Sequence, residues 1–482
     1  MPSTTMSIAL RKRSARAPLL LDHARTGSVI RHFHATQSQP MWFLAAGAGF
    51  AALYLGSRYV VRAQERLRRQ RAGLPVDEED ADFEGDAYTA TPARRMSEIL
   101  GVDFGTVNLR LSTASLTNGH ERVRVIESAD GLRAIPAAVA VDNDNVSVGV
   151  LARSLMGRKP GYTGTATRVL LERSSVKDET YALELDGKTY SPEWAAEILL
   201  DYVHSMAARS LGEEKARDGF PTILSVPAGL SEQERGTLER VASSAGFEVV
   251  LSVDEPIAAL HAVERSAIED QDDEALSTLS GSTPEATIAV FDMGGYKSSV
   301  TLLQRNNATF NVLQSAATFD VSGKAVDALL FDRVVAKFKQ ETNIDLSIDP
   351  MASFRVLEAV ETAKIELSSR RSTDLNLPFI TADRTGAKHL VQKLSAYDLA
   401  RACEGQGKRT TALCDDVLAS AGISKNGIAL LVLVGGGVRS DPIREHLESY
   451  FGRKAFSGRN FKPEEAVVVG AAEYGRRLAS EA

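Results

Sequence analysis

The sequence predicts an α/β protein of two related lobes, preceded by a membrane-spanning helix. One short pattern occurs at residues 99–106 and again at 288–295, each time an apolar run followed by Asp, one spacer and Gly. From residue 98 onward, candidate strands alternate with candidate helices, which favours an α/β class. Residues 41–57 contain no charged side chain. Two copies of one pattern at a domain-sized separation indicate a duplicated unit.

The repeated pattern suits phosphate and metal chemistry. Asp103 and Asp292 end the two strand-like runs, and a carboxylate there can hold a hydrated Mg²⁺ beside a phosphate. The glycine that follows each Asp can adopt a positive φ and bring backbone N–H groups close to that phosphate. Two such units would clamp one nucleotide from opposite sides.

Other elements can be placed along the same body. Ser231 has the character of a helix N-cap, and Pro442 suits the first turn of a helix that begins near Asp441. Glycines 435–437 stand between a buried strand and that helix, where they make room for a flat ligand or an anion. Strands are expected at 99–103, 222–226, 249–253 and 428–434, and an amphipathic helix at 351–368.

Charge and cysteine content exclude several classes of protein. Residues 1–72 carry twelve Lys and Arg against two acids, whereas the remaining 410 residues carry 44 basic and 61 acidic side chains. An acidic body argues against nucleic acid as the main partner. Cys403 and Cys414 are expected on one helix face in the core, too far apart for a disulfide.

The N-terminus has the composition of a mitochondrial presequence. Residues 1–40 hold six Lys and Arg against the single acid Asp22, together with many Ser and Thr, and are expected to lie outside the fold. The pattern Arg31 to Thr36 is similar to a two-step presequence cleavage site, which would place the mature end near Met41.

Residues 41–61 are predicted to form a single transmembrane helix. Trp42, Tyr54 and Tyr59 lie at its edges, and five arginines follow between Arg62 and Arg71. A secretory apolar region and an amphipathic surface helix are the alternatives. The positive-inside rule places the body in the matrix if the membrane is the mitochondrial inner membrane, whereas a stop-transfer route would place it in the intermembrane space. Another organelle membrane also remains open.

Two polar stretches are predicted to lack packed structure. Residues 62–97 form a linker, first basic and then acidic, whose charges should keep it extended. A docking role for its acidic part is the alternative. Residues 264–285, rich in Asp, Ser and Thr, are expected to be a flexible surface insertion.

Several motifs share one order and spacing with a known family. They are Gly101–Thr106, Ser225–Ala228, Glu255-Pro256, Phe291–Gly295, the 361–369 segment, Val434–Gly436 with Arg439, Glu464–Val467 and Gly470–Ala472. Over residues 98–482 the chain resembles the nucleotide-binding domain of the 70-kilodalton heat-shock chaperones, within the actin-like ATPase superfamily. The resemblance implies an actin-like ATPase fold of two lobes around a cleft that binds ATP or ADP with Mg²⁺. The chain ends after the closing helix, so we expect no peptide-binding domain.

The resemblance also implies the site. It assigns catalytic roles to Asp103, Arg153, Glu255 and Asp292, and water-mediated Mg²⁺ binding to Asp103, Glu255 and Asp292. The implied nucleotide-binding residues are Gly105, Thr106, Val107, Gly294, Gly295, Tyr296, Lys297, Glu361, Lys364, Ser368, Gly435, Gly436, Gly437, Arg439 and Glu464.

Departures from the family pattern gather at the terminal phosphate. Arg153 aligns where the family keeps a catalytic lysine, and Val107 replaces a threonine. Tyr296, Lys297 and Ser299 replace a glycine, a threonine and an aspartate. Further departures are Lys324 for an acid, Ile365 for an arginine and Gly437 for a serine. Hydrolysis of this kind depends on positioning and electrostatics, so these changes predict slow or absent turnover.

The sequence therefore predicts a membrane-anchored nucleotide-binding protein with weak or absent ATP hydrolysis. It would act as a regulatory or scaffolding subunit of a chaperone or membrane complex. One alternative is an active ATPase that works with a separate client-binding subunit. Another is a structural subunit with an empty cleft.

Overall fold

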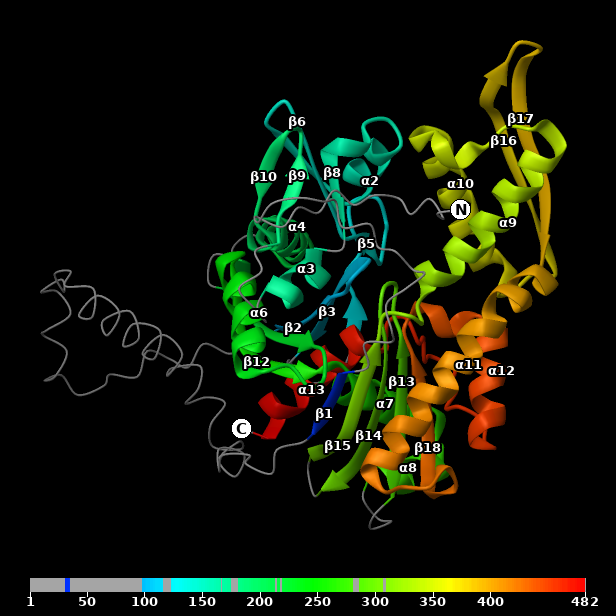
Figure 1. The fold of residues 1–482 in the computed structure, drawn as a ribbon. Helices are drawn as coiled ribbons and strands as arrows, with labels where there is room; N and C mark the ends of the chain where they lie inside the picture. The colour runs from blue at the N-terminus through cyan, green and yellow to red at the C-terminus, as the bar shows by residue number, and fades with distance from the viewer. Residues whose placement is uncertain are drawn as a thin grey trace, which may run out of the picture.

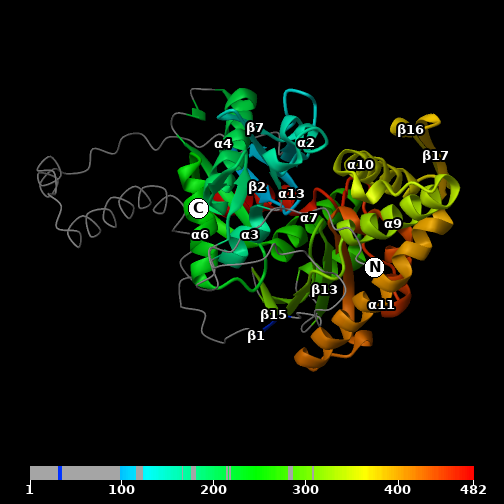
Figure 2. The same cartoon turned by 45° about the horizontal axis from the view of Figure 1, so that its top comes forward.

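The computed structural model describes residues 31–34 and 98–481, apart from 116–122, 166, 175–180, 213–214, 217–218, 281–285 and 307–308. Two lobes, each built on a twisted sheet, stand on either side of a cleft (Figure 1). Lobe I comprises residues 98–270 and 466–481, and lobe II comprises residues 31–34 and 287–451. In a second view, β2, α3, α4 and α6 of lobe I again lie on one side of the molecule, and α9, α10 and α11 of lobe II lie on the other (Figure 2).

The sheet of lobe I has the strand order β12-β11-β2-β3-β4, with β5 beside β3. Its central strand β2 is antiparallel to β3 and parallel to β11. The strands are β2 (Glu98–Phe104), β3 (Asn108–Ser115), β4 (Val123–Val125), β5 (Ile135–Pro136), β11 (Phe220–Val226) and β12 (Phe247–Asp254).

The sheet of lobe II repeats this arrangement, in the order β1-β15-β14-β13-β18. Its strand β13 is antiparallel to β14 and parallel to β18, as β2 is to β3 and β11. The strands are β1 (Arg31–His34), β13 (Thr287–Met293), β14 (Ser298–Asn306), β15 (Thr309–Thr318) and β18 (Ile428–Val434). Asp103 near the end of β2 and Asp292 near the end of β13 therefore hold equivalent positions, as the repeated pattern predicted.

Helices cover both sheets. Lobe I carries α2 (Val150–Met156), α3 (Thr167–Ser174), α4 (Pro192–Leu211), α6 (Glu232–Ser244), α7 (Glu255–Asp270) and α13 (Ala466–Glu481). Lobe II carries α9 (Gly323–Thr342), α10 (Pro350–Leu367), α11 (Ala396–Ala421) and α12 (Asp441–Phe451), with α8 (Asp273–Leu279) between the lobes in the chain. The predicted cap is confirmed: Ser231 begins α6 in a reciprocal capping box with Glu234.

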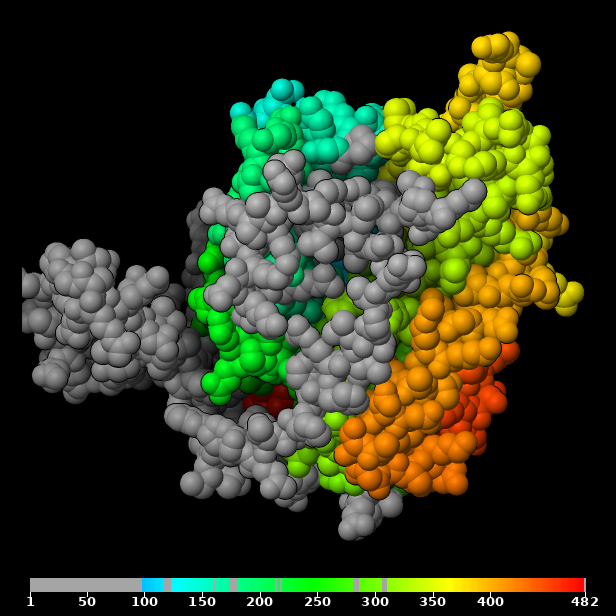
Figure 3. Space-filling view, viewed as in Figure 1, coloured from blue at the N-terminus to red at the C-terminus, as the bar shows by residue number. Residues whose placement is uncertain are grey.

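Smaller elements complete each lobe. Strands β6 (Ala138–Asp142), β7 (Asn145–Val148) and β8 (Thr163–Thr165), with the hairpin β9 (Leu183–Leu185) and β10 (Lys188–Tyr190), extend lobe I. The hairpin β16 (Ser372–Asp383) and β17 (Gly386–Ser395) stands out from lobe II (Figure 3). Short 3₁₀ turns occupy Pro160–Tyr162, Leu346–Ile348, Lys425–Gly427 and Gly436–Arg439.

A shared core joins the lobes. Ile99 and Ile223 of lobe I lie in one buried cluster with Ile288 and Val432 of lobe II, together with side chains of α7 and α13. These two helices approach so closely that a Cβ on Gly470 would lie 1.7 Å from the carbonyl oxygen of Ala258. Only glycine fits at this crossing, and the base of the cleft is accordingly a packed hinge.

Two sequence predictions about the chain's polar segments are corrected. The flexible insertion expected from residue 264 is wrong as far as residue 279, because α7 continues to Asp270 and α8 follows. Polar composition misled here because Ala275 and Leu279 pack into the shared core. Residues 281–285 lie outside the described residues.

The second correction concerns the expected presequence, since Arg31–His34 form β1 at the edge of the lobe II sheet, antiparallel to β15. The expectation that residues 1–40 stand outside the fold is therefore wrong for these four residues. The predicted transmembrane helix and the 62–97 linker lie outside the described residues. Among the helices that the structure does describe, none combines the length and apolarity needed to cross a bilayer. Cys403 and Cys414 are both buried in α11, which confirms the core assignment.

Candidate functional site

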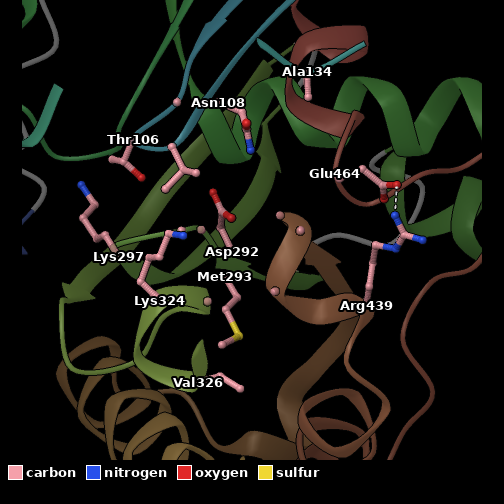
Figure 4. A pocket seen from close by; sticks show the side chains of 18 of the residues that line it. Thr106, Asn108, Ala134, Asp292, Met293, Lys297, Lys324, Val326, Arg439 and Glu464 are labelled. Carbon is pink, nitrogen blue, oxygen red and sulfur yellow. Dashed lines mark hydrogen bonds and ion pairs between the residues drawn. The ribbon is translucent and has the colours of Figure 1, made fainter. Parts of the chain in front are cut away.

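The cleft between the lobes has a volume of about 360 Å³ and is lined by both copies of the repeated pattern. The loop after β2 contributes Gly105, Thr106 and Val107, and the loop after β13 contributes Gly294 and Gly295. Figure 4 shows Thr106, Lys297 and Lys324 toward one end, Arg439 and Glu464 at the other, and Asp292 between them. A ligand that spans the cleft could therefore contact the lysines at one end and the pair of Arg439 and Glu464 at the other.

Three carboxylates line the cleft beside the two glycine loops. Asp103 comes from β2, Glu255 is the first residue of α7, and Asp292 comes from β13. Burial, together with the charge of Glu255, raises the pKa of Asp103 to about 6 against the attraction of Arg110. Burial and the charges of Glu255 and Asp103 raise the pKa of Asp292 to about 7. Mutual repulsion of this kind is what a divalent cation would relieve.

The acids fit a hydrated Mg²⁺ better than a directly bound metal. Within the described residues, no group of three or more His, Cys, Asp or Glu side chains converges closely enough to ligate an ion. Mg²⁺ commonly keeps several of its waters and binds through one or two carboxylates and substrate phosphates. Asp103, Glu255 and Asp292 could support an ion in that mode, and the Mg²⁺ site stays a prediction.

Arg168 lies within this acidic group and was missed by sequence reasoning. It is 4% exposed, and its guanidinium donates to Glu255 at 2.7 Å, Glu172 at 2.9 Å and the carbonyl oxygen of Phe104 at 2.6 Å. Lys297 adds a second cation, 3.5 Å from Glu172. The available signal was the spacing of Arg168 and Glu172 on one helix face, either side of the apolar run 169–171.

The second end of the cleft is built for a flat group. Gly435 follows β18 with φ of 85°, and a Cβ there would lie 2.3 Å from Oδ1 of Asp292. Arg439 donates to Glu464 at 2.9 Å. Elsewhere along the cleft, near Lys324, Lys364 donates to Asp327 at 2.6 Å and to the carbonyl oxygen of Gly323 at 3.1 Å. The remaining predicted residues, Glu361, Ser368, Gly436 and Gly437, also line the cleft.

Arg153 and Tyr296 lie elsewhere. Both line a second cavity of about 410 Å³, and neither lines the first. Arg153 on α2 of lobe I forms ion pairs with Glu361 and, at 3.5 Å, with Glu358, both on α10 of lobe II. Burial would raise the pKa of Glu361, but Lys324 and Arg153 lower it to about 2. The structure therefore does not bring Arg153 together with the three acids. Instead, its ion pairs with Glu358 and Glu361 connect the two lobes, and we call this group of three residues the clasp.

A family model described as Hsp70 protein matches residues 99–481. The chain belongs to the Hsp70 family. The match covers both lobes and every residue of the cleft, so the two-lobed fold is the actin-like ATPase fold of Hsp70 nucleotide-binding domains. Members of this family bind ATP or ADP with Mg²⁺ and work with protein partners, so chaperone-related nucleotide binding is the general function of this Hsp70 domain.

Proposed function

We propose that this Hsp70-family protein binds Mg-nucleotide, hydrolyses it weakly or not at all, and serves as a regulatory or scaffolding subunit on a membrane. The observation that carries the binding is the convergence of two glycine loops and three acids on one cleft. The base would lie against Gly435–Gly437 and Arg439, and the phosphates would extend toward Thr106 and Gly295. Asp103, Glu255 and Asp292 would hold the Mg²⁺ through water.

Weak hydrolysis is supported by what surrounds the phosphate end. Lys297 and Ser299 line the cleft where the family pattern has a hydroxyl and a carboxylate, and Arg153 is engaged in the clasp. A water that attacks phosphorus must be positioned and its charge balanced, so such changes slow the reaction greatly.

The test is binding and single-turnover hydrolysis on the purified protein. We expect bound nucleotide in the preparation and turnover well below ~1 s⁻¹, the low end of ordinary enzyme rates. Restoring Gly, Thr and Asp together at positions 296, 297 and 299 should raise turnover, whereas each single reversion should do little. Brisk hydrolysis by the natural protein would favour an active ATPase, which the retained acids also permit. An empty cleft would favour a structural subunit.

Nucleotide affinity should also depend on the two equivalent aspartates. Asp103→Asn and Asp292→Asn each remove a charge that supports the hydrated metal, so both should weaken Mg-nucleotide binding in calorimetry. Unchanged affinity in both variants would contradict the two-sided clamp.

The clasp gives a kinetic prediction. Arg153→Ala removes the ion pairs to Glu358 and Glu361 that join the lobes, so nucleotide should dissociate roughly three- to tenfold faster while its association rate stays similar. Stopped-flow release of a fluorescent nucleotide measures this. Arg370→Ala is the matched control, since Arg370 pairs with Glu366 of the same lobe. Equal release rates in both variants would exclude a role for the clasp.

The membrane and organelle assignments rest on the sequence. The uncharged segment 41–57 with aromatic edges supports a single span, and the composition of residues 1–40 supports mitochondrial import to the inner membrane, with the body in the matrix. Because β1 precedes this segment and pairs with β15 of the body, the proposal requires that Arg31–His34 be absent from the lobe II sheet in the imported protein. We expect the full-length protein to resist carbonate extraction. Complete release by carbonate would rule the anchor out.

A further inference from the structure

The second cavity lies beside the nucleotide cleft, between the two lobes, and has a volume of about 410 Å³. Lobe I contributes Ala137 and Met156 to its wall. Lobe II contributes Leu329, Phe354 and Leu357. Figure 2 shows α2, which carries Met156, beside α10, which carries Phe354 and Leu357. A volume of this size, with apolar walls and a few polar groups, is typical of small-molecule sites.

Contacts between the lobes form part of the cavity wall. A Cβ added to Gly157, at the end of α2, would lie 2.5 Å from Cδ1 of Phe354, so this ring packs on the backbone of lobe I. The clasp lies in the same wall. Toward the nucleotide cleft, Val107 of lobe I packs on Gly295 of lobe II, where a Cβ would lie 2.0 Å from Cγ2 of the valine. A molecule held in this cavity would therefore contact both lobes at once.

A buried acceptor without a partner lines the same cavity. Gln406 of α11 is 2% exposed, and its Oε1 accepts no hydrogen bond from any residue that the structure describes. A buried acceptor that stays unpaired is unfavourable, and such groups are nearly always satisfied in native proteins. A ligand with an N–H or O–H group would supply the donor.

The cavity also has an excess of negative charge, since five acidic and three basic side chains line it. The acids that pair with a Lys or Arg are Asp327 with Lys324 (3.5 Å) and Lys364 (2.6 Å), Glu358 with Arg153 (3.5 Å), and Glu361 with Lys324 (3.0 Å). Over the described residues, Asp320 and Asp332 have no Lys, Arg or His within 4 Å, and of the basic side chains Arg409 has no acid within that distance. Partial burial raises the pKa of Asp332. A bound cation would balance the excess.

We propose that the second cavity binds a small organic cation, an amine on an aryl or alkyl body, which contacts both lobes. The body would lie against Met156, Leu329 and Phe354. The ammonium would be attracted by Asp320 and Asp332, and an N–H group would donate to Gln406. The site is separate from the proposed nucleotide function and can be tested without nucleotide.

The probes are phenylpropylamine, phenylpropanol and phenylpropionate, which share one body and differ in charge. Saturation-transfer NMR on the full-length protein in detergent, without nucleotide, measures their affinities against a protein-free detergent blank. We expect the amine to bind roughly three- to fivefold more tightly than the alcohol, and the carboxylate to bind most weakly, because the acids of this partly exposed site attract the cation and repel the anion.

Four variants locate the site. Asp332→Asn should lower the affinity for the amine roughly threefold and leave that for the alcohol unchanged. Glu341→Gln is the matched control, because Glu341 is an exposed acid of the same helix that does not line the cavity. Gln406→Met keeps the length of the side chain but removes the acceptor, and should weaken amine and alcohol alike by roughly threefold. Ala328→Phe fills the cavity from α9 and should weaken all three probes at least about tenfold.

Three results would overturn the site. Equal affinities of the natural protein for amine and alcohol would contradict selection of a cation. Equal losses in Asp332→Asn and Glu341→Gln would mean that the acidic surface in general attracts the amine. Full binding to Ala328→Phe would place the amine outside the cavity. None of these results bears on nucleotide binding, so the proposed function would stand.

The contact with both lobes has its own measurement, and this readout alone rests on the proposed nucleotide binding. Saturating phenylpropylamine should slow the release of a fluorescent nucleotide by about threefold or more, because separation of the lobes then breaks contacts with the amine. An amine that binds without changing the release rate would overturn the bridging of the lobes. Absence of any nucleotide binding would overturn the proposed function and leave the amine site to its own titration.

Discussion

Replacing Arg168 by methionine should lower the free energy of unfolding by about 3–5 kcal/mol, the usual cost of breaking a buried ion pair. The guanidinium is the buried partner of both Glu172 and Glu255, so its loss leaves two carboxylates without their closest cation. Denaturant unfolding monitored by circular dichroism measures the change. The double variant Arg168→Met with Glu255→Gln should recover part of the loss, because the orphaned charge is then removed as well.

A matched surface pair provides the control. Arg265 and Glu269 are also four residues apart on one helix and 2.9 Å apart, but more of each side chain is exposed. Arg265→Met should therefore cost less than about 1 kcal/mol. Similar losses in both variants would mean that burial does not set the contribution of Arg168.

In the absence of divalent cations, Asp292→Asn should gain stability relative to the natural protein as the pH rises. The pKa of Asp292 is raised from 3.8 to about 7 in the folded protein, so the folded state holds a proton that the unfolded state has released. The stability contributed by that proton is lost as the pH rises from about 4 to about 7. Between pH 5 and 7.5 the advantage of the variant should grow by about 2–3 kcal/mol.

Comparison of the two proteins at each pH removes the contributions of titrating groups that do not interact with Asp292. Burial lowers the pKa of His261, so charging of that imidazole in the unfolded state also changes stability below pH 6.5, but it does so equally in both proteins. Millimolar Mg²⁺ should stabilise the natural protein at pH 7.5 and do much less for the variant. If the stability difference between the two proteins does not change from pH 5 to 7.5, Asp292 is ionised over that whole range and its charge is compensated by neighbouring cations.

Local pattern was sufficient to predict the parts of the site that belong to single strand ends. Asp103 and Asp292 were found because each follows an apolar run and precedes a glycine, and the match of β2 with β13 confirms their equivalence. Gly435 was found in the same way after β18. These positions depend on backbone geometry that a short stretch of sequence determines by itself.

The predictions that failed depended on packing between distant segments. Arg153 was expected at the phosphate, but its neighbours come from α10, about two hundred residues later in the chain. The side chain of Arg168 gains its role only when α3 meets α7, and the helices of residues 255–279 are held by apolar contacts that a polar composition hides. No local periodicity encodes which cation faces which acid across the cleft.

The last helix of the body lies against its first strand, and this has a consequence for synthesis. The hydroxyl of Ser112 in β3 donates to the carbonyl oxygen of Val468 at 2.6 Å, across 356 residues of sequence. A Cβ on Gly101 in β2 would lie 2.6 Å from the backbone of α13, so the strand and helix are fitted to each other. Most of lobe I is therefore synthesised early, while one face of its sheet is still exposed. That face is covered only after α13, near the end of the chain, has been synthesised. During that interval the nascent protein presents apolar surface for other chaperones to bind, so this Hsp70 domain should itself depend on assisted folding.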